Sequence, residues 1–229
     1  MLGPTLPKPN MNDLFIIDTE TCGLTGPVVE LAYLKVDTEL NVLEEFCVRV
    51  NPEKPIDPRA TEIHGITDAD VADCQTMAEI TAELRHFVEP IFYIGHNCSF
   101  DIRMTDPFIR PRSSLCSLAL AREHIKGTSN NKLATLQAEL SLPVQQSHSA
   151  LGDVHTTRDL LLYIVKLTGV PFIKLIERAD LPRLIPKMPF GKYKGVTILR
   201  VPSDYRAWLL EQGDIPKDLR YTLEKMKNL

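Results

Sequence analysis

The sequence lacks the features that would place it in a membrane, outside the cell or among disulfide-rich proteins. None of its apolar runs approaches the roughly 20 residues that a membrane-spanning helix needs. The N-terminus has no basic stretch followed by an apolar one, as a secretory signal would have. The five cysteines are scattered and form no CxxC pair, which argues against a disulfide framework and a structural zinc site. We therefore expect a cytoplasmic protein that does not bind membranes.

The sequence also lacks the overall basic charge of many nucleic-acid-binding proteins, because its net charge is −4. This average conceals an asymmetry. Residues 1–171 contain 14 basic and 23 acidic residues, a balance of −9, whereas residues 172–229 contain 12 and 7, a balance of +5. The acidic part could hold cations, and the basic part could meet a polyanion. Two solvated surfaces of different composition are the alternative.

Composition along the chain predicts its organisation. Hydrophobic residues make up 44% of the 229 residues, which is enough for one core domain with a small annex. The proline-containing residues 1–12 are expected to form a flexible leader. A core domain over 13–170, a linker with scattered prolines over 171–186 and a small basic module over 187–229 are expected to follow.

Periodicity predicts the secondary structure. Strands are expected at residues 14–17, 28–36, 43–50 and 91–95. Helices are expected at residues 77–88, 117–124, 132–140 and 149–167, from Thr67, and in the C-terminal module at 205–212 and from 216. Three strands in succession, followed by helices and a further strand, indicate a mixed α/β fold.

Two carboxylates stand at the end of the first predicted strand. Asp18 and Glu20 are two residues apart, so in a strand they point to the same face. They repel each other unless a cation lies between them, and oxygen ligands of this kind suit Mg²⁺ or Mn²⁺. A turn with two solvated acids is the alternative.

A third carboxylate, Asp101, follows the buried strand predicted at 91–95. It belongs to the run Gly95-His96-Asn97-Cys98-Ser99-Phe100-Asp101, which could bring it to the same sheet edge as the first two. An acid at a helix N-terminus, favoured there by the helix dipole, is the alternative.

His148 and Asp153 lie at the start of the helix predicted at 149–167. If this helix packs on the sheet, Asp153 can join Asp18 and Glu20, and His148 can overhang the same site as a base. A histidine that caps the helix or lies on the surface is the alternative.

Four segments in a fixed order give the sequence a specific resemblance. They are FIIDTETCGL (15–24), IHGIT (63–67), GHNCSFD (95–101) and HSALGD (148–153). Over residues 13–167 the chain resembles the DEDDh 3′→5′ exonucleases of the DnaQ-like, ribonuclease H-like superfamily. Within this family, the chain looks most like the bacterial exodeoxyribonucleases. The features that carry this likeness are DTETCGL, the short core and FGKYKG (190–195) before a Trp-containing helix. They extend the resemblance to about residue 227.

The resemblance implies a fold and a reaction. The fold would be a ribonuclease H-like, mixed five-stranded sheet flanked by helices, with a small C-terminal helical extension. Two Mg²⁺ ions, for which Mn²⁺ can substitute, would lie between Asp18, Glu20, Asp101 and Asp153. Asp18 would bridge both ions, Glu20 and Asp153 would complete one, and Asp101 would hold the second, partly through water. His148 would be the general base that takes a proton from the attacking water.

The resemblance also implies a pocket for the 3′-terminal nucleotide. The residues expected to bind it are Thr21, Cys22 and Gly23 through their backbone, Leu24, His64, Ile66, Asn97 and Phe100. Leu24 could wedge between the last bases, and ordinary packing is the alternative. Thr25 and Gly26 after it are small, which leaves activity on duplex ends open.

The expected partners follow from the same resemblance. DNA 3′ ends are the expected substrate, with a role in repair or recombination. RNA or oligonucleotide trimming and a proofreading-type subunit of a larger complex are the alternatives, and a homodimer is compatible with the family. The basic and aromatic residues of the C-terminal module could bind DNA or a protein partner. The helical spacing around Trp208 favours a core position.

Overall fold

The computed structural model describes residues 14–145, 148–182, 184–212 and 215–226, so the predicted leader lies outside it. These residues form two compact units, unit 1 up to Ala179 and unit 2 from Asp180. Within the described ranges, no helix combines the length and apolar character needed to cross a bilayer.

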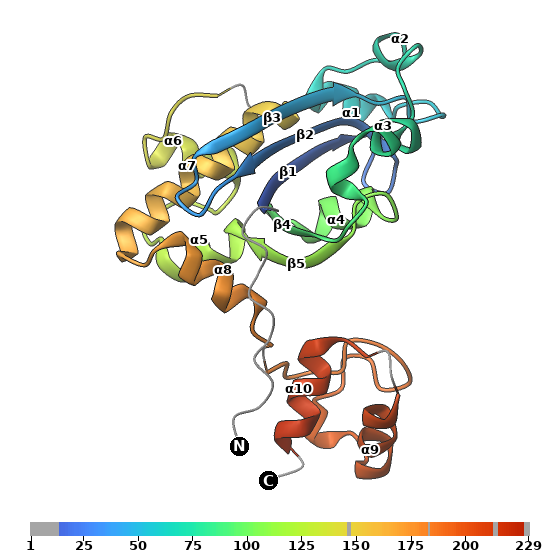
Figure 1. Ribbon diagram of the computed structural model, residues 1–229, viewed down its shortest axis with the longest axis vertical. Helices are drawn as coiled ribbons and strands as arrows, with labels where there is room; N and C mark the ends of the chain where they lie inside the picture. Colours follow the sequence, from blue (N-terminus) through green and yellow to red (C-terminus); the bar gives the residue numbers. More distant parts are fainter. Residues whose placement is uncertain (1–13, 146–147, 183, 213–214, 227–229) are drawn as a thin grey trace. The chain divides into compact units, whose positions relative to one another are not determined.

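Unit 1 is built on a five-stranded mixed sheet with the order β3-β2-β1-β4-β5 (Figure 1). Its strands are β1 Leu14–Thr21, β2 Val28–Val36, β3 Val42–Arg49, β4 Ile91–Gly95 and β5 Pro111–Cys116. β1, β2 and β3 pair antiparallel, whereas β4 is parallel to both β1 and β5. The expected ribonuclease H-like sheet is therefore confirmed.

Helices cover both faces of this sheet (Figure 1). They are α1 Pro58–His64, α2 Asp68–Val71, α3 Met77–Glu83, α4 Ser99–Thr105, α5 Ser117–His124, α6 Leu133–Glu139, α7 Ala150–Thr168 and α8 Phe172–Asp180. A 3₁₀ helix, Arg85–Phe87, follows α3. The predicted strands and the predicted helices at 117–124, 132–140 and 149–167 are confirmed. β5 and α1 were not predicted, because each begins with a proline and neither shows a long periodic pattern.

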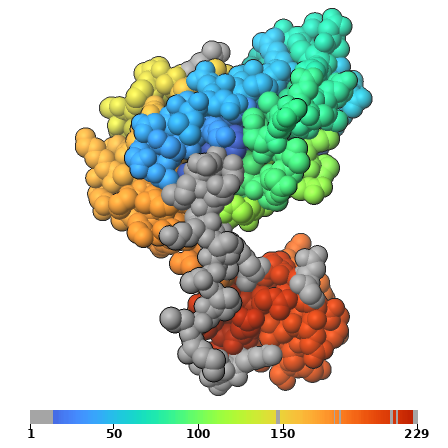
Figure 2. Space-filling view, in the orientation of Figure 1, coloured from blue at the N-terminus to red at the C-terminus, as the bar shows by residue number. Residues whose placement is uncertain are grey.

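The side chains of β1 point alternately into two hydrophobic cores. Leu14 and Ile16 face the core under α5, α6, α7 and α8, whereas Phe15 and Ile17 face the core under α3 and α4. All four side chains are fully buried, as expected for a strand covered on both faces. Figure 2 shows the blue strand residues flanked by green residues on one side and by yellow and orange residues on the other.

Unit 2 has a small core of its own. Its helices are α9 Ser203–Glu211 and α10 Lys217–Met226, with a 3₁₀ helix at Ile198–Arg200. Met188, Ile198, Leu209, Leu219 and Leu223 are among the buried side chains. These elements confirm the predicted C-terminal helical extension.

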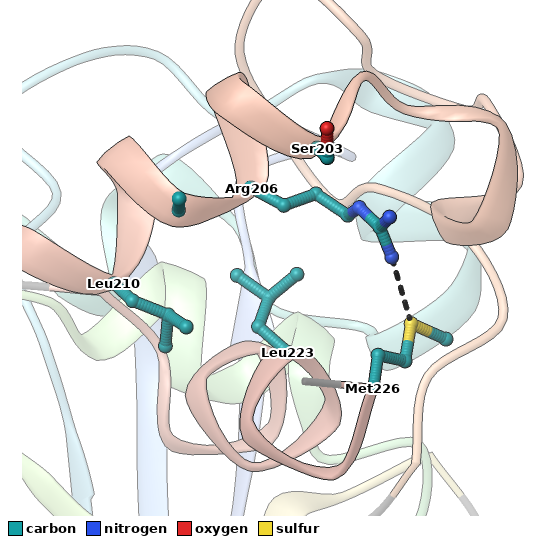
Figure 3. Close-up of a pocket in the computed structure, with 6 residues that line it drawn as sticks. Ser203, Arg206, Leu210, Leu223 and Met226 are labelled. Carbon is teal, nitrogen blue, oxygen red and sulfur yellow. Dashed lines mark hydrogen bonds between the residues drawn. The ribbon is translucent and has the colours of Figure 1, made fainter. Parts of the chain in front are cut away.

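A pocket of about 200 Å³ lies between α9 and α10 (Figure 3). The Arg206 side chain crosses it, and its Nη1 donates to Met226 Sδ at 3.8 Å.

In the FGKYKG segment, the Tyr193 ring meets the Tyr205 ring edge-on at 4.8 Å, and Lys192 lies over the face of Tyr193. These aromatic contacts order the basic segment within the unit.

Two expectations for the C-terminal part differ from the structure. Residues 172–180, expected to begin a linker, form α8, whose side chains Phe172, Leu175 and Ile176 are buried in the core of unit 1. Prolines bracket this helix but none interrupts it. Trp208 is 50% exposed rather than buried, because its neighbour Leu209 takes the inward position on α9.

The packing of α8 generates a stability prediction. Replacing Ile176 by alanine removes a fully buried side chain from the first core, so Ile176→Ala should cost about 2–4 kcal/mol. For a unit of this size the melting temperature should fall by roughly 4–12 °C. Leu184→Ala, at a position 64% exposed in the same predicted linker, is the control and should melt as the wild type. Equal melting temperatures for both variants would mean that α8 contributes nothing to unit 1.

Candidate active site

The candidate site lies where three parallel strands end. β1, β4 and β5 run in the same direction, so their carboxyl ends meet at one edge of the sheet. A Cβ at Gly95, the last residue of β4, would lie 3.1 Å from Ile17 O and 3.0 Å from Cys98 Cβ. The absence of a side chain at Gly95 therefore lets the turn after β4 press against β1 beside Asp18.

Three of the four predicted carboxylates come together at this edge. Asp18 and Glu20 project from β1, and Asp153 projects from the first turn of α7. One carboxylate oxygen from each lies within 4.8 Å of the other two. Ser149 begins the helix by accepting a hydrogen bond from Gly152 N through its side chain, at 3.2 Å. This cap fixes the start of α7 close to Asp153, the carboxylate that the first turn of the helix carries.

Asp101 reaches the same strand from the other face. Its Oδ1 accepts hydrogen bonds from Thr19 N at 3.2 Å and from Thr19 Oγ1 at 2.9 Å. Thr19 stands between Asp18 and Glu20, and strand alternation points it the opposite way. Asp101 is therefore adjacent to the three-carboxylate group without being a member of it, with one oxygen held by β1.

Burial disfavours the charged form of all four carboxylates, and repulsion from neighbouring carboxylates adds to it for Asp18, Glu20 and Asp101. Burial, and then the charges of Asp101, Asp153 and Glu20, raise the pKa of Asp18 well above its usual range. Burial and the charge of Asp153 raise the pKa of Glu20 to about 8. Burial raises the pKa of Asp101 and of Asp153 to about 6. A group of hard oxygen donors that resists carrying its own charge fits a divalent cation, which would neutralise it.

His148 lies at the entrance to this group. It is exposed, two residues before α7, with a left-handed backbone at φ 58°. Its charge acts on Asp153 and lowers the pKa of that carboxyl, against the larger effect of burial. The other histidine on this helix, His155, instead bonds Glu45 at 2.8 Å on β3 and lies outside the site.

Glu30 is a functional residue that the sequence reasoning missed. It lies directly opposite Glu20 in the β1–β2 register, so both side chains point to the α7 face. Its Oε2 accepts a hydrogen bond from Ala150 N, the first amide of α7, at 2.9 Å. It therefore anchors the helix that carries Asp153 and adds a further negative charge beside Glu20. A lone acid in the apolar run VVELAYL was the signal that could have revealed it.

A hollow of about 310 Å³ opens beside Glu20. Its lining residues are Glu20, Thr21, Gly23, Leu24, Asp57, Arg59, Ala60, Ile63 and His64. Leu24 is 84% exposed at this hollow and packs into neither core. We refer to this space, where the resemblance predicts a pocket for the 3′-terminal nucleotide, as the nucleotide hollow.

Two of the predicted binding residues lie beneath this hollow rather than in its lining. The Cys22 and Ile66 side chains are buried together with Val29, Ile56 and Val71. The backbone of Cys22 is also engaged, because its N–H donates to Pro27 O and its carbonyl accepts from Asp57 N. Cys22 and Ile66 therefore support, from beneath, the backbone of Thr21 and Gly23 and the helix α1.

His64 closes the hollow as the last residue of α1. Its Nδ1 accepts from Ile66 N at 3.0 Å, so the proton lies on Nε2, which donates to Thr21 O at 3.3 Å. Burial lowers the pKa of His64. The imidazole is therefore neutral and ties α1 to the end of β1.

The two remaining predicted residues lie on the β4 side. Asn97 is exposed two residues after the end of β4, with φ 65°. Phe100 is half-buried on α4, with the Arg103 guanidinium 5.4 Å from its ring centre. Neither lines the nucleotide hollow.

Comparison with known proteins defines the class. Residues 15–161 match the family model described as "Exonuclease" (RNase_T). Because the match covers more than half of the chain, this protein belongs to the RNase T/DnaQ-like exonuclease family. It is an enzyme of the DEDDh exonuclease class.

Individual relatives sharpen this assignment. The chain is 33% identical over 220 residues to exodeoxyribonuclease 10 of Escherichia coli K12, covering 92% of this chain and 97% of that protein. A solved structure of exonuclease X in complex with 5′-overhanging duplex DNA matches with a TM-score of 0.61 and 33% identity, covering 71% of this chain and 99% of that chain. The predicted resemblance to the bacterial exodeoxyribonuclease branch is thereby confirmed.

More distant matches agree with the fold. The PolC-type DNA polymerase III of Bacillus subtilis is 26% identical over 162 residues, covering 66% of this chain and 11% of that protein. Exonuclease I matches with a TM-score of 0.61 and 22% identity, covering 73% of this chain and 43% of that chain. Residues 177–229 match a separate family model described as "Putative quorum-sensing-regulated virulence factor".

The raised carboxyl pKa values generate a prediction on stability and pH. Glu20 has a pKa of about 8 in the folded protein against 4.5 ordinarily, so the folded state binds more protons between these values. Stability of the metal-free protein should fall as pH rises from about 4.5 to 8. Glu20→Gln removes this charge and should gain about 1–2 kcal/mol at pH 8.5, with allowance for solvent screening.

The measurement is thermal unfolding in EDTA. Glu20→Gln should melt roughly 3–6 °C above the wild type at pH 8.5 and close to it at pH 4.5. The exposed Glu89→Gln is the control and should leave the melting temperature unchanged at both pH values. A Glu20→Gln protein that melts below the wild type at pH 8.5 would contradict the repulsion inferred here.

Proposed function

We propose that this chain is a divalent-metal-dependent 3′→5′ exonuclease that shortens DNA from its 3′ end and releases nucleoside 5′-monophosphates. The observation that carries the proposal is the group formed by Asp18, Glu20 and Asp153, with Asp101 alongside and the nucleotide hollow at its edge. The similarity to exodeoxyribonuclease 10 supports DNA as the substrate.

The carboxylates would hold two divalent ions, for which we propose Mg²⁺, with Mn²⁺ able to substitute. Asp18 lies centrally, since the charges of both Asp101 and Asp153 act on it. When bound, the ions would stabilise the negative charge that develops on the attacking and leaving oxygens. Glu30 would act on this site by keeping α7, and with it Asp153, in place.

His148 would take the proton from the attacking water. The water oxygen forms a bond to the terminal phosphorus, and the bond from this phosphorus to the 3′-oxygen of the preceding nucleotide breaks. The leaving 3′-oxygen takes a proton from solvent, so the products are a nucleoside 5′-monophosphate and a strand with a new 3′-hydroxyl. The exposed position of His148 before α7 lets the imidazole exchange its proton with solvent after each cycle.

The nucleotide hollow would select the 3′ end. Gly23, with φ 150°, leaves the backbone open to close approach, and Thr21 and His64 would border the terminal sugar or base. Because α1 and the loop after β1 are bonded through Cys22 and Asp57, this hollow is formed before substrate arrives. Cys22 and Ile66 would act from beneath it, and Asn97 and Phe100 would contact the strand on the β4 side.

The first experiment measures shortening of a 5′-labelled single-stranded DNA with Mg²⁺, beside an RNA of the same sequence. We expect a ladder from the 3′ end that is faster on DNA. Asp18→Ala should abolish it, and His148→Ala should slow it by about 10²–10⁴-fold while keeping Mn²⁺ binding, measured by electron paramagnetic resonance.

The outcomes separate the alternatives. Faster trimming of RNA would assign the chain to the ribonuclease branch, and inactivity on both substrates would favour a subunit that depends on a partner. Turnover of His148→Ala at the wild-type rate would remove the general-base assignment. The half-buried His155→Ala, whose ring contacts Glu45 outside the carboxylate group, serves as the matched control.

A second prediction concerns Leu24 and duplex ends. An apolar side chain exposed at the rim of the hollow can enter between the last bases and unstack them. Leu24→Ala should therefore lower kcat/KM on a blunt duplex by about fivefold, equivalent to about 1 kcal/mol, and leave single-stranded DNA nearly unaffected. Val144→Ala, at a position 91% exposed elsewhere, is the control. Equal losses on both substrates would mean that Leu24 does not separate strands.

A further inference from the structure

A second hollow, of about 620 Å³, lies at the carboxyl end of β4. Its lining residues are His96, Asn97, Leu118, Arg122, Asn130, Asn131, Lys132 and Leu133. They come from the turn after β4, from α5, and from the loop that leads into α6. Neither the carboxylate group nor the nucleotide hollow contributes a residue to it, and we refer to it as the β4 hollow.

The lining of the β4 hollow is basic and rich in hydrogen-bond donors. Arg122 and Lys132 supply two cations, Asn97 and Asn130 supply side-chain amides, and no carboxylate lines it. The nearest acids in sequence are engaged elsewhere: Glu123 pairs with Arg178 at 3.0 Å, and Glu139 accepts from Ser129. Two unopposed cations in a part of the chain with a charge balance of −9 indicate an anionic ligand.

His96 braces the wall of this hollow. Its Nε2 donates to Asn131 O at 2.9 Å, so its Nδ1 is unprotonated and accepts from Ser117 Oγ, also at 2.9 Å. These two bonds join the end of β4 to α5 and to the loop before α6. Ser129 ties the same loop to α6 through Glu139, at 2.9 Å from its N–H. The wall is therefore formed in advance of any ligand, which lowers the cost of binding.

The β4 hollow is connected to the candidate active site through the turn after β4. Asn97 lies two residues before α4, which carries Asp101. Gly95 packs against Ile17 O, and Ile17 precedes Asp18. A strand whose last phosphate lies at Asp18 and Glu20 can therefore continue along this turn to the two cations.

We propose that the β4 hollow is a phosphate-binding site for the phosphodiester backbone of the strand being shortened. Arg122 and Lys132 hold backbone phosphates on the 5′ side of the scissile bond, and Asn97 and Asn130 donate to the same backbone. This proposal rests on the proposed nuclease function. It explains how a chain of net charge −4 holds a polyanion, because the attraction is local.

The test compares a long and a minimal substrate. For a single-stranded DNA of about 20 nucleotides, the double variant Arg122→Gln, Lys132→Gln should show KM raised about tenfold. The slope of log KM against log salt concentration should fall by roughly 1.4, about 0.7 for each phosphate contact removed from a single strand. The p-nitrophenyl ester of thymidine 5′-monophosphate does not reach the hollow, so kcat/KM for it should stay within about twofold of the wild type.

The paired substitution Arg85→Gln, Lys166→Gln removes two exposed cations that do not line the hollow and is the control for total charge. Unchanged KM and salt slope in the double variant, or equal losses with the long and the minimal substrate, would overturn the proposal. If the wild type hydrolyses neither substrate, the proposed function fails by itself. The hollow is then tested by fluorescence anisotropy of a labelled oligonucleotide in EDTA, in which weaker binding by the double variant supports it and equal binding overturns it.

Discussion

Repulsion among carboxylates at one sheet edge is the constraint on which the rest of unit 1 depends. Asp18 and Glu20 would move away from Asp153 if the elements carrying them were free to move, because burial and the charge of Asp153 raise the pKa of both. Two hydrophobic cores hold β1 from both faces and prevent that separation. The fold thus holds together a group of carboxylates that a divalent cation would neutralise.

Specific hydrogen bonds, in addition to the two hydrophobic cores, hold the elements of the site in place. Thr19 holds Asp101 to β1 from one face, and Glu30 holds the first amide of α7 from the other. His64 ties α1 to β1 in the same manner, and His96 ties β4 to α5 and the following loop. These supporting residues are neutral or acidic. Asp18, Glu20 and Asp153 each still offer one carboxylate oxygen to the group. Such supporting contacts determine how well a site is preorganised.

Charge is sorted in space within unit 1 as well as along the chain. The acidic group occupies the centre of the sheet edge, the nucleotide hollow lies beside Glu20, and the cations of the β4 hollow lie beside Asn97. Net charge is therefore a poor guide to the substrate of this chain. Unit 2 has a separate core and a separate family match.

The sequence by itself determined the strands of the first hairpins, the long helix that begins after Ser149 and the identity of the carboxylates. These follow from local periodicity, capping and motif order, which act over a few residues. The resemblance carried by Asp18, Glu20, Asp101 and Asp153 then implied the sheet and its topology. His148 as the general base is a prediction of the same kind.

Tertiary structure alone decided which distant residues support the site. Glu30 and Ala150 are 120 residues apart in the sequence, and Thr19 and Asp101 are 82 residues apart. No local sequence pattern therefore predicts either hydrogen bond. Helix α8 formed where prolines suggested a linker, because the apolar face of Phe172 and Ile176 is stabilised only when the first core covers it. Trp208 remained half-exposed because Leu209 fills the core position beside it. The physical reason is common to all these cases: burial and long-range hydrogen bonding depend on neighbours that only the folded chain brings together.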